Sequence, residues 1–196
     1  MTAAPPVATT ATDAPRRRNP FGLAVVIIGC VLVAAMWMYY LAADDGPGVY
    51  QLQDQTWRES AAPVCEQAYV DRMALVDTSQ GFITDPTPEQ MAVRAEIVDR
   101  ATDVVETMLT DIVAIPVDND RDREILATFE KYYRMIIADR RRYADQLRAG
   151  DAETFAESVV LGGPVSNVVT DFTAGVKGND VPACTPPHDL ANTRQP

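Results

Sequence analysis

The sequence predicts an all-α protein, with one N-terminal transmembrane helix and an extracytoplasmic domain that folds as an antiparallel four-helix bundle. Three observations lead to this fold class: a charge-free apolar stretch at 21–41, helical spacing of apolar residues across 63–177, and no strand-like alternation bounded by turns. We expect a disordered cytoplasmic tail (1–20), the membrane helix (21–43), a juxtamembrane linker or stalk (44–62), the bundle (63–177) and a C-terminal tail (178–196) tied back by a disulfide.

The apolar stretch is long enough to cross a bilayer. A hydrocarbon core of about 30 Å takes about 20 helical residues, because a helix rises about 1.5 Å per residue. The residues that orient the span lie at its two ends: Arg16, Arg17 and Arg18 before it, and Trp37, Tyr39 and Tyr40 at its C-terminal end. Arginines stay on the cytoplasmic side and aromatic rings favour the headgroup level. We therefore expect a single-pass protein of the cell membrane, with the N-terminus in the cytoplasm and the C-terminal domain outside.

Two other interpretations of this stretch stay open. It could be a cleaved signal peptide, although it is longer than the usual apolar region and Leu41 stands where a small residue is preferred. Ile27-Ile28-Gly29-Cys30 also resembles a loose lipobox with Cys30 as the acylated residue. Eleven apolar residues follow Cys30, where a lipoprotein usually turns polar. Both features favour a retained helix.

Composition excludes some classes of function. The apolar share of 47% is that of a globular chain, so wholesale disorder is excluded. The net charge is −11, and residues 46–196 hold 25 of the 28 acidic but 14 of the 17 basic residues. A nucleic-acid partner is not expected, because binding phosphates requires clustered basic residues. Arginine makes up 15 of the 17 basic residues, a bias that is typical of GC-rich bacteria.

Four helical segments are expected after the span. The first covers about 50–78 with a break near Pro63; the second starts at the capping sequence Thr87-Pro88-Glu89-Gln90 and stops at Pro116. The third runs from 118–120 to Gly150, and Asp151 caps a fourth that breaks at 162–164. The apolar positions expected to face the core are Val64, Ala68, Leu75 and Val76; Met91, Ala95, Val98, Val105, Leu109 and Ile112; Ile125, Phe129, Tyr132, Ile136, Tyr143 and Leu147; and Phe155, Val159, Val160, Val165, Val168, Val169 and Phe172.

Two cysteines follow the span. Cys65 lies in the first expected helix and Cys184 in the C-terminal tail. Two thiols in an oxidising compartment more often form a bridge than stay free, and no third cysteine competes on that side. We expect a Cys65–Cys184 disulfide that ties the tail to the base of the first helix.

A basic stripe on the third helix is the candidate partner-binding surface. Its residues are Lys131, Arg134, Arg140, Arg141, Arg142 and Arg148. Glu130, Asp139 and Asp145 are interleaved with it, which favours an exposed face with local ion pairs. The alternative is a docking surface for an acidic partner or lipid headgroups.

Acidic clusters do not predict a metal centre. Glu96, Asp99, Asp103 and Glu106 share one face of the second helix, which is either solvated or paired with the third helix. A di-iron centre is excluded because no expected helix carries a histidine. Asp118, Asp120 and Asp122 start like an EF-hand loop, but Arg123 and Phe129 replace its glycine and glutamate. We expect no metal and no cofactor.

The function class follows from the layout. We find no phosphate loop, no nucleophile elbow and no Cys–His nucleophile pair outside the tail, so an enzyme is not expected, and an envelope hydrolase ranks last. The favoured interpretation is an interaction module that binds another envelope protein or envelope component, with the lipid bilayer as the other contact. A ligand-binding or sensory outer domain is the alternative. A pocket with convergent Tyr and Arg side chains would favour it, and the tyrosines at 132, 133 and 143 either cover the core or line such a cleft. The partner and the oligomeric state stay open.

Overall fold

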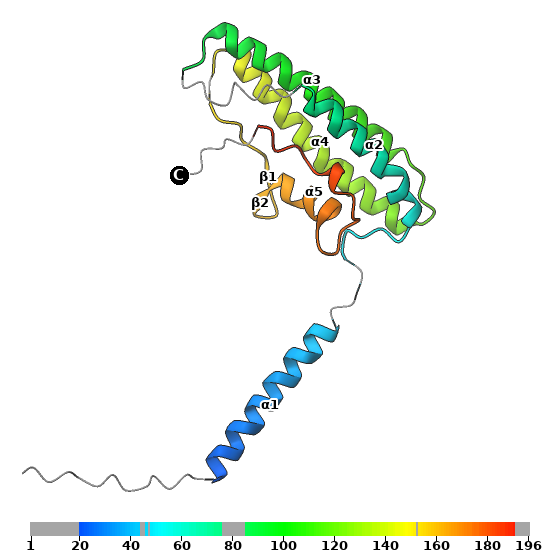
Figure 1. Cartoon of the computed structure of the whole chain (residues 1–196), viewed down its shortest axis with the longest axis vertical. Coiled ribbons are helices and arrows are strands. Elements are labelled where there is room, and N and C mark those ends of the chain that lie inside the picture. Colours follow the sequence, from blue (N-terminus) through cyan, green and yellow to red (C-terminus); the bar gives the residue numbers. More distant parts are fainter. Residues whose placement is uncertain (1–19, 44–45, 47, 76–84, 152, 191–196) are drawn as a thin grey trace, which may run out of the picture. The chain divides into compact units, whose positions relative to one another are not determined.

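The computed structural model describes residues 20–43, 46, 48–75, 85–151 and 153–190. In chain order its elements are α1 (Pro20–Ala43), α2 (Gln55–Met73), α3 (Pro88–Val113), α4 (Asp120–Arg148), β1 (Val159–Val160), β2 (Gly163–Pro164), α5 (Val165–Ala174) and the 3-10 turn η2 (Pro182–Cys184) (Figure 1). The predicted all-α class is confirmed. The chain divides into two compact units, Met1–Gly46 and Pro47–Pro196.

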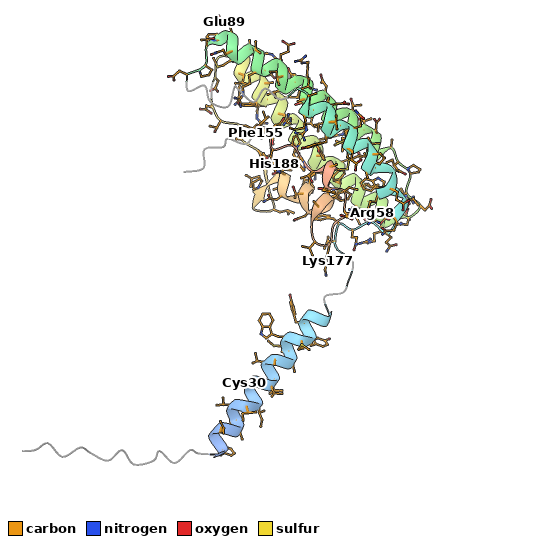
Figure 2. The ribbon with its side chains drawn as sticks, viewed as in Figure 1. Cys30, Arg58, Glu89, Phe155, Lys177 and His188 are labelled. Carbon is orange, nitrogen blue, oxygen red and sulfur yellow. A yellow bond between two sulfur atoms is a disulfide. The ribbon has the colours of Figure 1, made fainter. Side chains whose placement is uncertain are left out.

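The first unit contains α1. Among the described residues this is the one helix long and apolar enough to span a membrane, over Phe21–Tyr40, and none of that window is buried. Trp37, Tyr39 and Tyr40 all lie exposed on its C-terminal turns. Cys30, labelled in Figure 2, is also exposed on α1. Arg16, Arg17 and Arg18 fall outside the described residues.

Local sequence accounts for the ends of α3 and α4. Thr87 and Gln90 form the predicted capping box at the start of α3, in which each side chain accepts a hydrogen bond from the other residue's backbone N–H. Asn119 caps α4 through the backbone N–H of Asp122. After α4, Gly150 adopts φ +83°, the left-handed conformation that glycine tolerates best.

The core of the second unit lies between α2, α3, α4 and α5. Trp57 of α2 is fully buried, and its Nε1 donates to the Ile112 carbonyl of α3 at 3.0 Å. Its ring meets Phe172 of α5 edge to face at 5.7 Å, and Phe172 stacks on Phe129 of α4 at 4.1 Å. This aromatic chain joins all four helices.

The helical spacing predicted the buried faces of α3 and α4 well. Every predicted α3 core position is buried, as are those on α4 except Tyr132, which is half-buried. On α5 the buried members are Val165, Val169 and Phe172. A second apolar cluster forms where Met91, Ala95 and Val98 of α3, Tyr143, Ala144 and Leu147 of α4, and Leu190 of the tail meet.

The prediction for the first helix of the domain was wrong in two respects. Pro63 does not break α2, which continues through it to Met73. The loss of one backbone hydrogen bond there is offset by the packing of Ala61 and Cys65, which are fully buried on either side. The buried residues of α2 are Trp57, Ala61, Cys65 and Arg72, whereas Val64, Ala68 and Leu75 are only half-buried. Val76 falls outside the described residues.

The predicted fourth helix is also wrong in its first half. Residues 153–158 form no regular secondary structure, and β1 pairs antiparallel with β2 in a hairpin whose turn is Leu161 (φ 51°) and Gly162 (φ 85°). The Ser158 backbone N–H and hydroxyl donate to the buried Asp139 carboxylate at 2.6 and 2.9 Å. These hydrogen bonds to α4 replace the helical ones. Of the described residues of this segment, the ten of α5 form its α-helix, so the described part of the domain has three long α-helices and one short one.

The compact unit extends beyond the predicted bundle at both ends. Leu52 and Trp57, placed in the linker 44–62 by the sequence, are 3% and 0% exposed. Val181, Cys184 and Leu190 of the tail 178–196 are buried as well. Residues from both predicted flanking segments therefore belong to the core.

Candidate functional site

The predicted disulfide is confirmed. Cys65 of α2 and Cys184 of η2 form a bridge with their Cα atoms 4.9 Å apart, and both are fully buried. The bridge holds the segment that follows α5 against α2. In Figure 1 this segment runs along the long helices in red.

A small half-open pocket lies beside this segment, between α2, α3, α4 and the tail. The side chains that matter for its chemistry are Tyr69, Arg72, Met108, Tyr133 and Thr185. Its enclosed space is about 10 Å³, which is room for about one water molecule. Its lining includes one cationic side chain, Arg72, and two side chains that carry hydroxyls, Tyr133 and Thr185.

Two arginines beside the pocket share one carboxylate. The Arg140 guanidinium donates to both Asp189 carboxylate oxygens, at 2.7 and 3.1 Å, and its Nε donates to Thr102 at 3.0 Å. An Arg72 nitrogen lies 4.0 Å from Asp189 Oδ2. Arg72 also lies over the Tyr69 ring, 5.5 Å from its centre. Arg140 and Arg72 are 1% and 8% exposed, so both charges are largely removed from water.

Electrostatics at the cluster follow from this geometry. Burial raises the pKa of Asp189, but the hydrogen bonds and charge of Arg140, with the charge of Arg72, outweigh it, so the pKa lies below its ordinary value. Burial raises the pKa of Tyr133 far above its ordinary value, against the opposing effect of the two arginines. Tyr133 is therefore a neutral hydroxyl at physiological pH.

The structure does not gather the predicted basic stripe into one open surface. Arg140 is buried in the cluster just described. Arg141 is half-buried and donates to Asp99, Asp103 and Glu106 of α3. Arg148 pairs with Asp99 and with Asp145. The sequence left open whether the acidic face of α3 is solvated or paired with the next helix. In the structure three of its four residues, Asp99, Asp103 and Glu106, pair with α4.

The remaining basic residues of the stripe are exposed but engaged. Arg134 pairs with Glu130 one turn away at 2.8 Å, and Arg142 pairs with the buried Asp139. The Lys131 ammonium lies over the Tyr132 ring. Among exposed groups such contacts are worth little, so these three residues remain accessible to a partner.

Electrostatics also explain the acidic face. Burial raises the pKa of Asp99, but hydrogen bonds from Arg148 and Arg141 outweigh it and hold the pKa below its ordinary value. The pKa of Arg141 lies above its ordinary value because the hydrogen bonds of the α3 carboxylates exceed the effect of burial. The two helices are held together by charges that stay ionised at neutral pH.

Two buried polar residues organise the entry to the domain, and the sequence analysis missed their role. One Asp122 carboxylate oxygen accepts from the backbone N–H groups of Gln53 and Asp54, each at 2.9 Å. The Asn179 side chain accepts from the Leu52 N–H at 2.8 Å and donates to the Tyr50 carbonyl at 2.9 Å. A polar residue inside a hydrophilic stretch carries no sequence signal for such distant partners.

No group of His, Cys, Asp or Glu side chains suited to a metal ion occurs in the described part of the chain. The acids at 118, 120 and 122 serve the start of α4 instead: Asp120 and Asp122 lie in its first turn, where the helix dipole favours them. Burial raises the pKa of Asp122, but hydrogen bonds from Asn119 and the backbone outweigh it and lower the pKa.

Comparisons of this chain with protein-family models, with curated proteins and with solved structures find no match.

Proposed function

We propose that this chain is a single-pass membrane protein with its N-terminus in the cytoplasm, and that it displays the helical domain 47–196 outside the membrane as an interaction module. The orientation is supported by the Cys65–Cys184 disulfide, because such bridges persist in oxidising compartments. The aromatic residues at the C-terminal end of α1 suit the outer headgroup level. Three arginines before the span suit the cytoplasmic side.

Protease protection tests the orientation. In cells whose outer envelope is permeabilised but whose cell membrane is intact, an added protease should remove the domain and leave a fragment that contains α1. In inverted membrane vesicles the same protease should cut only the N-terminal tail. A domain that survives in the first preparation and is cut in the second would overturn the proposed orientation.

The interaction surface that we favour lies on the outer side of α2. Tyr69, Val70 and Met73 are 49%, 59% and 46% exposed; we name these three residues the α2 surface. Exposed large apolar side chains that adjoin one another are typical of a protein-binding site. Tyr69 also lines the pocket, so the same partner can reach both features. The exposed charges at Lys131, Arg134 and Arg142 on α4 form the second candidate surface.

A photo-crosslinking amino acid placed at Val70 tests this surface in intact membranes. We expect a discrete adduct from position 70 and none from Ala127, an exposed α4 position that serves as the matched control. Charge reversal at Arg142 should leave the adduct unchanged if the α2 surface carries binding. Equal adduct patterns from both positions, or loss of the adduct on that reversal, would contradict the assignment.

A ligand-binding outer domain is the second candidate function. It is favoured by one observation, the pocket in which Tyr69, Arg72 and Tyr133 converge. The small volume limits a ligand to one inserted polar group.

A further inference from the structure

The pocket at Arg72 carries an unbalanced positive charge. Among the described carboxylates, only Asp189 forms an ion pair with Arg72 or Arg140. Asp189 makes its two short hydrogen bonds to Arg140 and stays 4.0 Å from Arg72. The cluster therefore contains two guanidinium groups and one carboxylate. A charge that is largely buried is costly unless an opposite charge accompanies it, so the site favours one further negative charge.

The groups around the pocket are suited to an oxygen anion. Arg72 lines the pocket and is its cation, and a guanidinium N–H can donate a charge-assisted hydrogen bond to one carboxylate oxygen. The Tyr133 and Thr185 side chains also line it, and the Thr185 hydroxyl lies 3.2 Å from the hydroxyl of Thr173 on α5. The Arg72 guanidinium also lies over the ring of Tyr69, which is 49% exposed, 5.5 Å from its centre.

The volume of the pocket and the charge of the cluster restrict the class of ligand that can bind. Counted over the described residues, the cluster has one more positive than negative charge, which a monoanion would balance. The enclosed space is about that of one water molecule, so one carboxylate oxygen fits while the rest of the ligand stays in the open mouth. A tetrahedral phosphate or sulfate is larger and usually carries two charges. The stem beyond the carboxylate would lie on Met108 and on the exposed Tyr69 ring.

We propose that the Arg72 pocket binds the carboxylate group of a monoanion, with Arg72 as its ionic contact and the Tyr133 and Thr185 side chains beside it. The assignment rests on the second proposed function, ligand binding, and is independent of the membrane orientation. A carboxylate can come from a free small acid or from the C-terminus of a partner chain. Both sources share this chemistry.

The experiment uses the full chain in nanodiscs of zwitterionic lipid. Saturation-transfer NMR on the acetate methyl group reports binding, at constant ionic strength, and acetamide is the neutral probe of the same shape. We expect a saturable acetate signal and none from acetamide. Arg72→Gln should weaken acetate binding about tenfold, the usual effect of losing one charge-assisted contact. Arg58→Gln removes a half-buried arginine of the same helix (Figure 2) and should leave binding unchanged.

Two further arms complete the test. Arg72→Lys keeps the charge and should retain part of the affinity, and Tyr133→Phe should weaken binding in a variant that keeps the core volume. The dipeptide N-acetyl-Ala-Ala and its C-terminal amide distinguish the sources. Tighter binding of the dipeptide acid than of acetate indicates a partner's C-terminus, and the reverse order indicates a free small acid. If acetate and the dipeptide acid bind no better than their neutral amides, the proposal is overturned, whatever the membrane orientation proves to be.

Discussion

Arg140 in the middle of α4 holds Asp189, 49 residues later in the chain, through both carboxylate oxygens. This bidentate contact and the Cys65–Cys184 bridge fasten the same C-terminal segment to the long helices, one to α4 and the other to α2. The segment that follows α5 is thus a structural part of the domain, and it forms one wall of the Arg72 pocket.

Removal of the Asp189 carboxylate should be strongly destabilising. Asp189→Ala leaves two largely buried guanidinium groups without their shared partner, a change that typically costs about 3–5 kcal/mol. Urea unfolding of the full chain in detergent, followed by circular dichroism, measures it. Asp145→Ala is the control, because Asp145 is 76% exposed in its pair with Arg148 and should cost less than about 1 kcal/mol. Equal effects of the two variants would contradict this account.

Loss of the disulfide should lower stability without changing the fold. The bridge spans 119 residues, for which the chain-entropy model gives about 5 kcal/mol as an upper value. The double variant Cys65→Ser, Cys184→Ser should therefore unfold at lower urea concentration. Mass spectrometry of the native protein under non-reducing conditions should find these two cysteines linked and the third, Cys30, unlinked. Two free thiols at 65 and 184 would refute the bridge.

Trp57 should behave as a core residue and not as part of a linker. Trp57→Ala removes a fully buried ring that contacts Phe172 and bonds to Ile112, and should cost about 3–5 kcal/mol. Glu59→Ala, an exposed change two residues later on α2, is the matched control and should be near neutral. A domain truncated before residue 63 should likewise fail to give a cooperative transition. Near-normal stability of Trp57→Ala, or of the domain truncated before residue 63, would instead support the prediction that this segment is a linker.

Stability should fall in acid. The pKa values of Asp99, Asp122 and Asp189 are lowered in the folded chain, so the folded state binds fewer protons than the unfolded state near pH 4. Their contribution is fully present above the unfolded pKa near 4 and is lost as the pH falls through the folded values. Unfolding free energy should be flat from about pH 6 to 7 and drop below about pH 4. In Asp189→Asn the drop should be smaller, because one of the three groups no longer titrates.

The hairpin turn offers a stabilising substitution. Leu161 is 78% exposed and adopts φ 51°, a conformation that is unfavourable for a residue with a branched apolar side chain. Asparagine before Gly162 suits this turn, so Leu161→Asn should raise stability by up to about 1 kcal/mol. Thermal unfolding measures the change, and Val159→Asn, at an exposed position with ordinary backbone, should give no gain. A loss of stability in Leu161→Asn would show that the leucine side chain makes a contact that outweighs its backbone strain.

Prediction succeeded where spacing and capping agree. The α3 capping box and the apolar positions from Met91 to Ile112 needed no knowledge of the neighbouring helices. On α2 the same method selected the wrong face, because the buried side includes Arg72 and the helix contains Pro63. It predicted a fourth helix that starts after Asp151 and breaks at 162–164, whereas residues 153–158 form no helix and Asp139 of α4 accepts the Ser158 N–H. The basic stripe was expected to be an exposed face with local ion pairs, whereas Arg140 is buried and Arg141 pairs with α3.

The sequence alone predicts the apolar span, the limits of α3 and α4, and the pairing of Cys65 with Cys184. Composition, periodicity and the elimination of other cysteine partners decide these features. The sequence alone does not suffice for the burial of Trp57, the sharing of Asp189 by two arginines, or the pocket that they adjoin. These features arise from contacts between residues more than 40 positions apart. The free energies of these contacts depend on burial and on charge partners, and both exist only once the helices have packed. Residues nearby in the sequence therefore do not predict these contacts.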